Sequence, residues 1–105
     1  MTDLQSMTIS PQADLRAAIA AIDRGTRQVA LVTDDAGVLM AVVTDGNVRR
    51  GLLRGLTLDA PVREVMNSTP TTVRVEDGVE AARHMMRERQ LHHVPLIDAA
   101  GRVVD

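Results

Sequence analysis

The chain has 105 residues, of which 45% are hydrophobic and 25% are charged, and it contains no Phe, Tyr, Trp or Cys. This composition is typical of an ordered globular domain; it excludes disulfides and thiolate zinc sites, and it offers no aromatic platform for single-stranded nucleic acid. The 14 acidic and 12 basic residues give a formal charge of −2, and none of the basic residues is Lys. A Walker-type phosphate loop is therefore excluded, and the unclustered charge argues against a nucleic acid partner.

The N-terminal sequence Met-Thr-Asp has no basic segment followed by an apolar stretch, as a secretory signal would require. The composition also lies far from that of membrane proteins. We therefore expect a cytoplasmic protein with no membrane partner.

The first predicted elements are a short strand at residues 7–10 and a helix that ends at Gly25. Ser10 or Gln12 is expected to cap this helix, with Pro11 in its first turn. The apolar residues that recur at helical spacing and should face the core are Leu15, Ala18, Ile19 and Ile22.

The next predicted elements are two strands, at residues 29–33 and 38–44, joined by the turn sequence Asp-Asp-Ala-Gly as a hairpin. A second helix is expected from about Asp45 to Arg54, with Gly55 just past its end. Residues 56–61 are predicted to be a linker, and residues 62–66 a helical turn.

The second half of the chain repeats the first at an offset of 64 residues. Asp34-Asp35-Ala36-Gly37 matches Asp98-Ala99-Ala100-Gly101, and the apolar pattern around the two turns repeats in the same register. The second copy is predicted to contain strands at 71–75, 93–97 and 102–104, with a helix whose start is favoured by the charges of Glu76 and Asp77. The inner stripe of that helix is expected to be Val79, Ala82, Met86 and Leu91.

We place the first repeat at residues 1–58 and the second at 59–105. The counterpart of Thr44 in the second repeat would fall at position 108, beyond Asp105. We therefore expect the second repeat to be incomplete and the parent protein to continue.

Three motifs resemble those of the CBS domain, and the two copies of the repeat resemble a CBS-domain pair, or Bateman module. They are Val62–Met66 followed by Pro70–Val73, then His92–Asp98, and the stretch Ala41–Arg50 that runs through Thr-Asp-Gly-Asn. The resemblance covers nearly the whole chain. It implies an α/β (α+β) fold in which each repeat is β-α-β-β-α and the two pack with pseudo-two-fold symmetry.

Residues 43–66 are similar to the CBS pair that precedes the catalytic domain of some bacterial sugar-phosphate nucleotidylyltransferases. This closer resemblance implies that the fragment is a regulatory module without catalytic residues, attached to a C-terminal catalytic domain, and that it forms a homodimer.

The resemblance also implies a ligand, an adenine nucleotide (AMP, ADP or ATP), with S-adenosylmethionine as a less favoured choice and no required cofactor. The residues that it assigns to the pocket are Met66, Thr71, His93 and Pro95 from the second repeat with Thr44 and Asn47 from the first. Arg50 would contact a phosphate. A mirror pocket would use Met7, Thr8 and Val29, but its sugar-side residues would lie near positions 108 and 111.

Each of these assignments has a plain structural alternative. Thr44 could be an ordinary helix cap, Arg50 a solvated surface residue, His93 a solvated histidine and Met66 core filler. A metal site is disfavoured because His92 and His93 are adjacent on a predicted strand and point to opposite faces.

Asn47 departs from the family pattern, which usually has Asp at the ribose position. An amide offers one neutral acceptor oxygen, whereas a carboxylate accepts from both sugar hydroxyls. This difference supports a rival hypothesis, in which the module is a ligand-free scaffold that only holds a dimer of the parent enzyme. A second rival is a fragment that contributes residues to a transferase active site, which only the parent sequence after Asp105 could show.

Overall fold

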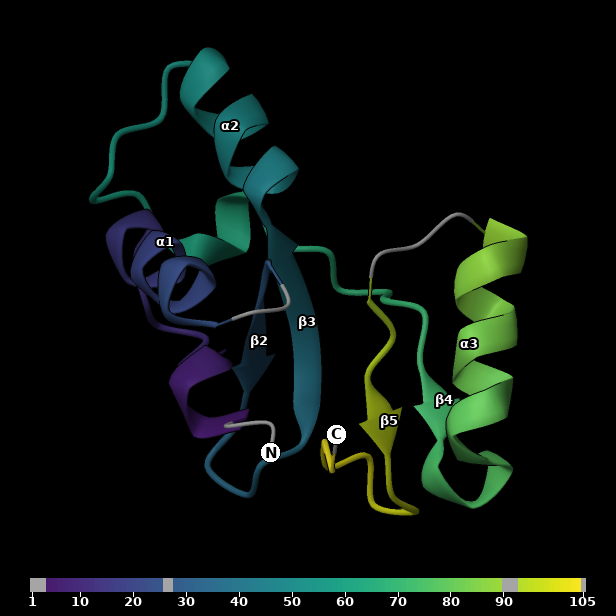
Figure 1. Cartoon of the computed structure of the whole chain (residues 1–105). Coiled ribbons are helices and arrows are strands. Elements are labelled where there is room, and N and C mark those ends of the chain that lie inside the picture. The colour runs from purple at the N-terminus through teal and green to yellow at the C-terminus, as the bar shows by residue number, and fades with distance from the viewer. Residues whose placement is uncertain (1–3, 26–27, 90–92, 105) are drawn as a thin grey trace.

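The computed structural model of the chain describes residues 4–25, 28–89 and 93–104 (Figure 1). Leu91, for which the sequence predicts a core position, and His92, the first residue of a motif that resembles the CBS domain, lie outside the described residues. The described elements, where η marks a short 3-10 helix, are η1 Leu4–Met7, β1 Thr8–Ile9, α1 Leu15–Arg24, β2 Val29–Thr33, β3 Leu39–Thr44, α2 Asp45–Leu53, η2 Val62–Glu64, β4 Val73–Arg74, η3 Val75–Asp77, α3 Gly78–Arg89 and β5 Leu96–Ile97.

The first repeat is built on a three-stranded sheet in the order β1-β2-β3. β1 is parallel to β2, with Ile9 opposite Val32, and β2 and β3 form the predicted antiparallel hairpin. Four consecutive residues of β2 are buried, as expected for a strand covered on both faces. One face packs on α1, α2 and η2, and the other contributes to a smaller cluster that includes Val103 from the second repeat.

The predicted cap of α1 is wrong, because Asp14 is the N-cap and its Oδ1 accepts a hydrogen bond from the backbone N–H of Ala17 at 2.9 Å. Ser10 and Gln12 instead bond to each other in the preceding turn, which also contains Pro11. Asp14 stands directly before the first buried apolar residue of the helix, where a short polar side chain reaches the unpaired N–H groups of the first turn.

The buried face of α1 also differs from the prediction. Leu15, Ala18 and Ala21 are fully buried, whereas Ile19 is 38% exposed and Ile22 is half-buried. Ala18 and Ala21 share a core cluster with small and β-branched residues of β2 and β3. Small side chains at three-residue spacing let the helix lie close to the sheet, so the bulkier isoleucines are displaced toward the edge of the contact.

The elements that close the first repeat agree with the prediction. α2 spans Asp45–Leu53, and Gly55 follows it with a φ of +100°, a value that favours glycine. After the linker, η2 provides the predicted helical turn, with Val62 fully buried in the core of the first repeat.

The second repeat reproduces the register of the first at the predicted offset. In β4 and β5, Val73 pairs with Leu96 as Ile9 pairs with Val32. α3 takes the place of α1, and residues 98–104, which follow β5, contain no helix. The predicted inner stripe of α3 is only partly correct, because Ala82 is buried but Met86 is half-buried and Val79 is 51% exposed.

The two Asp-x-Ala-Gly turns are built identically, as the sequence predicts. Asp34 Oδ1 accepts from the N–H groups of Ala36 and Val38 at 2.9 and 3.0 Å, and Asp98 Oδ1 accepts from those of Ala100 and Arg102 at 2.9 Å each. The turn glycines have φ values of +84° and +85°. An aspartate that bonds to its own turn and a glycine with positive φ therefore fix both hairpins.

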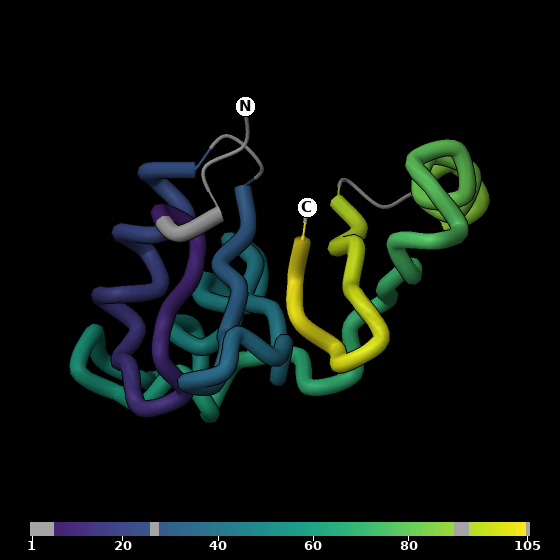
Figure 2. Tube along the Cα trace, turned by 90° about the horizontal axis from the view of Figure 1, so that it is seen from below, coloured from purple at the N-terminus to yellow at the C-terminus, as the bar shows by residue number. Residues whose placement is uncertain are grey.

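Two of the backbone hydrogen bonds that join the repeats match each other, and each involves the residues that lie 64 positions from those of the other. The N–H of Leu39 donates to the carbonyl of Gly101 at 2.9 Å, and that of Val103 donates to the carbonyl of Gly37 at 3.4 Å. An approximate two-fold axis therefore passes near the bridge between Val38 and Arg102. In Figure 2, α1 and α3 lie at opposite ends of the molecule, with the strands of both repeats between them.

Candidate functional site

A cleft of about 170 Å³ lies between the repeats, where β3 ends and α2 begins. Its lining residues come from both repeats: Val42, Thr44, Asn47, Asn67, Pro70, Thr71 and His93. The structure therefore brings together four residues that the sequence analysis assigned to one pocket, Thr44, Asn47, Thr71 and His93. The backbone N–H of Val42 donates to the carbonyl of Asn67 at 3.0 Å, and the N–H of Asn67 donates to the carbonyl of Val42 at 2.8 Å. This pair of hydrogen bonds connects the two sides of the cleft.

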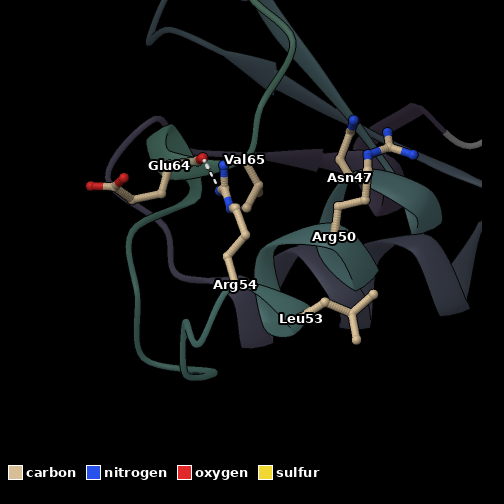
Figure 3. A pocket seen from close by; sticks show the side chains of 6 residues that line it. All are labelled: Asn47, Arg50, Leu53, Arg54, Glu64 and Val65. Atoms are coloured by element: carbon tan, nitrogen blue, oxygen red, sulfur yellow. Dashed lines mark hydrogen bonds between the residues drawn. The ribbon is translucent and has the colours of Figure 1, made fainter.

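The other predicted site residues lie outside this cleft. Arg50 lines a neighbouring hollow of about 320 Å³ whose residues are Asn47, Arg50, Leu53, Arg54, Glu64 and Val65 (Figure 3). Met66 packs against the core of the first repeat, as the structural alternative for it expects. Pro95 is buried, and its carbonyl accepts from the N–H of Val73 at 3.0 Å. For the mirror pocket, Met7 and Val29 are buried in the cluster between the repeats.

Thr44 and Asn47 form a reciprocal capping box at the start of α2. The Thr44 hydroxyl accepts from the backbone N–H of Asn47 at 3.1 Å, and the Asn47 carbonyl oxygen accepts from the backbone N–H of Thr44 at 2.8 Å. Such a cap contributes about 1 kcal/mol to helix stability. The helix-cap interpretation of these residues is therefore correct, and the one acceptor oxygen of Asn47 already has a partner within the protein.

Asn67 was missed by the sequence analysis. Its Oδ1 accepts from the backbone N–H of Thr69 at 3.0 Å and from the Thr69 hydroxyl at 3.2 Å. The signal that could have found it is the polar run Asn-Ser-Thr-Pro directly after Met66, which predicts a turn at the entrance to the second repeat.

Arg50 is placed over the first turn of α2. A Cβ added to Gly46 would lie 3.3 Å from Nη1 of Arg50, so the guanidinium folds back toward the start of the helix. In Figure 3 it extends toward the Asn47 side chain. Arg49 pairs with Asp45 at 2.8 Å, whereas Arg50 makes no ion pair with any residue that the structure describes. Its positive charge is therefore available beside Asn47.

The charge of the cleft favours an electron-rich group. None of its lining residues is a carboxylate, and it adjoins the first turn of α2, where the helix dipole is positive. Within the described ranges, no cluster of three or more His, Asp or Glu side chains could hold a metal ion, and no helix combines the length and apolarity needed to cross a bilayer.

Curated proteins with similar sequences include arabinose 5-phosphate isomerases. The isomerase GutQ of Escherichia coli is 32% identical over 72 residues, which cover 69% of this chain and 22% of that protein. The probable isomerase of Haemophilus influenzae is 26% identical over 99 residues, which cover 92% of this chain and 29% of that protein. YlbB of Bacillus subtilis, an uncharacterised protein, is 26% identical over 98 residues, covering 90% and 64%. The chain thus spans about a fifth to a third of the isomerases that it matches.

Solved structures share the whole fold. A CBS domain protein from Pyrobaculum aerophilum, complexed with AMP, aligns with a TM-score of 0.81 at 23% identity, over 99% of this chain and 84% of that one. CBSX2 in complex with AMP aligns with a TM-score of 0.78 at 24% identity, over 99% of this chain and 82% of that one. The CBS domain pair of protein MJ0100 is in complex with 5′-methylthioadenosine and S-adenosyl-L-methionine. It aligns with a TM-score of 0.78 at 18% identity, over 93% of this chain and 80% of that one.

The CBS domain profile matches residues 1–54 and again 62–105, so it recognises both halves of the chain. Two matches in tandem agree with the repeated register and with the approximate two-fold axis between the halves. This chain therefore belongs to the CBS domain family and contains a pair of such domains.

Proposed function

We propose that this CBS pair binds an adenine nucleotide in the cleft between its repeats and thereby regulates a domain attached to it. The observation that carries the proposal is the cleft itself, to which the first repeat contributes Thr44 and Asn47 and the second contributes Thr71 and His93. Solved structures with a similar fold are complexes with AMP, or with 5′-methylthioadenosine and S-adenosyl-L-methionine. AMP, ADP and ATP are the first choices for this chain, and S-adenosylmethionine is the second.

The residues suggest how such a ligand would lie. Val42 and Pro70 give the cleft an apolar surface for the base, which is the surface a chain without aromatic residues can offer. Asn47 lines both the cleft and the hollow that holds Arg50. A nucleotide with its base in the cleft would therefore direct its phosphate toward the Arg50 guanidinium.

Regulation would follow from the position of the cleft. A ligand held by both repeats favours the arrangement in which its contacts on the two sides are satisfied, and it shifts the population toward that arrangement. The isomerase relatives favour a sugar-phosphate isomerase as the regulated domain over the nucleotidylyltransferase expected from the sequence. A homodimer and the repeat boundary at residue 58 also remain predictions.

Thermal melting with AMP, ADP, ATP or S-adenosylmethionine tests the proposal. A ligand at 100 times its dissociation constant stabilises the folded chain by about 2.7 kcal/mol, which raises the Tm of a domain of this size by about 10 °C or more. If none of the four shifts the Tm at millimolar concentration, the proposal is wrong.

Two pairs of variants then locate the site. Thr71→Val removes a hydroxyl from the cleft at nearly constant volume and should weaken nucleotide binding about two- to tenfold. The matched control is Thr57→Val, in an exposed turn away from the cleft.

Arg50→Ala should weaken AMP binding about tenfold, while Arg49→Ala, which removes an exposed arginine paired with Asp45, should not. Equal effects within either pair would show that the site lies elsewhere.

A second candidate function is a ligand-free scaffold that holds a parent enzyme in an oligomer. Asn47 favours it, because the acceptor oxygen at the position where the family usually places Asp is committed to the cap of α2. A dimer that persists in light scattering without nucleotide, combined with no Tm shift from any nucleotide, would favour the scaffold.

A further inference from the structure

The cleft contains two asparagines whose side chains are held in the same way. The carbonyl oxygen of each is bonded inside the protein, to Thr44 N–H for Asn47 and to Thr69 N–H for Asn67. Both residues line the cleft, one from each side. We infer that Asn47 and Asn67 form a donor pair, so that the cleft accepts a nucleotide without distinguishing ribose from 2′-deoxyribose. This inference rests on the proposed function and concerns its specificity.

The orientation of both amides follows from hydrogen-bond chemistry. A backbone N–H can only donate, so the amide atom that faces it must be the oxygen, and a flipped amide would place two donors against each other. Asn67 is fixed twice, because the hydroxyl of Thr69 also bonds to the same oxygen at 3.2 Å. The Asn67 oxygen accepts two hydrogen bonds and is fully used, and the Asn47 oxygen is turned toward the Thr44 N–H. The group that each amide presents away from its backbone partner is therefore the NH₂ group, which donates.

Position decides which part of a nucleotide meets Asn47. Asn47 lines both the 170 Å³ cleft and the 320 Å³ hollow that contains Arg50. In a nucleotide the sugar lies between the base and the phosphate. With the base in the cleft and the phosphate at Arg50, the sugar would lie beside the Asn47 NH₂ group.

A donor beside the sugar does not select for the 2′-hydroxyl. Two adjacent hydroxyls are recognised most strongly by a carboxylate, which accepts from both, and none of the residues lining the cleft is acidic. The Asn47 NH₂ group can donate to the 3′-oxygen that ribose and 2′-deoxyribose share. Loss of the 2′-hydroxyl therefore leaves no protein group without its partner, which is the condition under which discrimination is weak.

The test compares AMP with 2′-deoxy-AMP by isothermal titration calorimetry. The wild-type chain should bind the two within about threefold of each other, since no charged hydrogen bond is lost with the 2′-hydroxyl. Asn47→Asp should raise the preference for AMP to about tenfold or more, because a carboxylate oxygen would then accept from the sugar. This variant keeps the helix cap, since its other oxygen still faces the Thr44 N–H.

Gln12→Glu is the matched control, because it makes the same change from amide to carboxylate at an exposed residue outside the cleft. It should leave the ratio of the two affinities unchanged. A wild-type chain that prefers AMP tenfold or more, or an Asn47→Asp chain with an unchanged ratio, would overturn the inference while leaving the proposed function intact. If neither nucleotide binds the wild type, the proposed function and the inference fail together.

Discussion

The two repeats share one backbone plan but differ in how well they are buried. The core cluster of the first repeat that packs on its helices contains eight residues, each no more than 3% exposed. The cluster of the second contains Val73, Ala82 and Leu96, each 6–7% exposed. In the first repeat, α2 and η2 pack on the sheet together with α1.

This difference separates what local sequence determines from what packing determines. Turns and strand register follow from neighbouring residues, so they repeat closely at an offset of 64. Burial depends on how many elements cover a surface, so equivalent residues end in different surroundings. Leu15 is fully buried, and its counterpart Val79 is 51% exposed.

The largest predicted effect uses that pair. Leu15→Ala should reduce the free energy of unfolding by about 2–5 kcal/mol, because it removes a fully buried side chain and leaves a cavity. Val79→Ala should change it by less than about 0.5 kcal/mol, because the side chain is half exposed and alanine is the better helix former. Urea denaturation of both variants measures the difference, and a comparable loss in the two would mean that the α3 surface is covered in solution.

A smaller effect should be the same in both repeats. Gly37→Ala and Gly101→Ala each place a Cβ on a residue with positive φ, which costs about 1–2 kcal/mol. Neither new Cβ would approach another heavy atom closer than 3.4 Å, so backbone strain rather than collision sets the cost. Urea denaturation should give losses within about 0.5 kcal/mol of each other, the usual scatter between independent sites; a clearly larger loss at Gly37 would show that only the first hairpin is essential.

The fold was predictable from sequence wherever short-range chemistry decides it. The Asp-x-Ala-Gly turns, the hairpin of β2 and β3, and the end of α2 at Gly55 depend on residues a few positions apart. The face of α1 was not, because the close approach of Ala18 and Ala21 to the sheet involves residues distant in the sequence. Periodicity alone ranked Ile19 above Ala21 because it counts hydrophobicity and ignores available space.

The candidate site was predictable in part, through the resemblance to CBS pairs. That resemblance assigned Thr44, Asn47, Thr71 and His93 to one pocket, and the structure brings these four together. Asn67 joins them through its backbone pairing with Val42, which no sequence pattern announces. Arg50 was predicted from its helix, but its position over Gly46 depends on the rotamer that the small glycine permits.

The smallest predicted effect concerns a chemical difference between the two turns. Val38 in the first turn is replaced by Arg102 in the second, and Nε of Arg102 lies 3.4 Å from Oδ2 of Asp98. The pKa of Asp98 is held below its ordinary value of 3.8, first by the hydrogen bond from the backbone N–H of Arg102, then by that of Ala100, and less by the charge of Arg102, while burial opposes the shift.

Because the pKa of Asp98 is lower in the folded chain, the stability that its carboxylate contributes is complete above pH 3.8. It is lost as the pH falls through the lower folded value. Arg102→Val, which removes the guanidinium, should raise this pKa slightly but leave it below 3.8, because valine keeps the backbone N–H that makes the largest contribution. A titration of the Asp98 carboxyl followed by NMR measures both values. A return to the ordinary pKa in the variant would mean that the guanidinium, rather than the turn shared by both repeats, holds the carboxylate ionised.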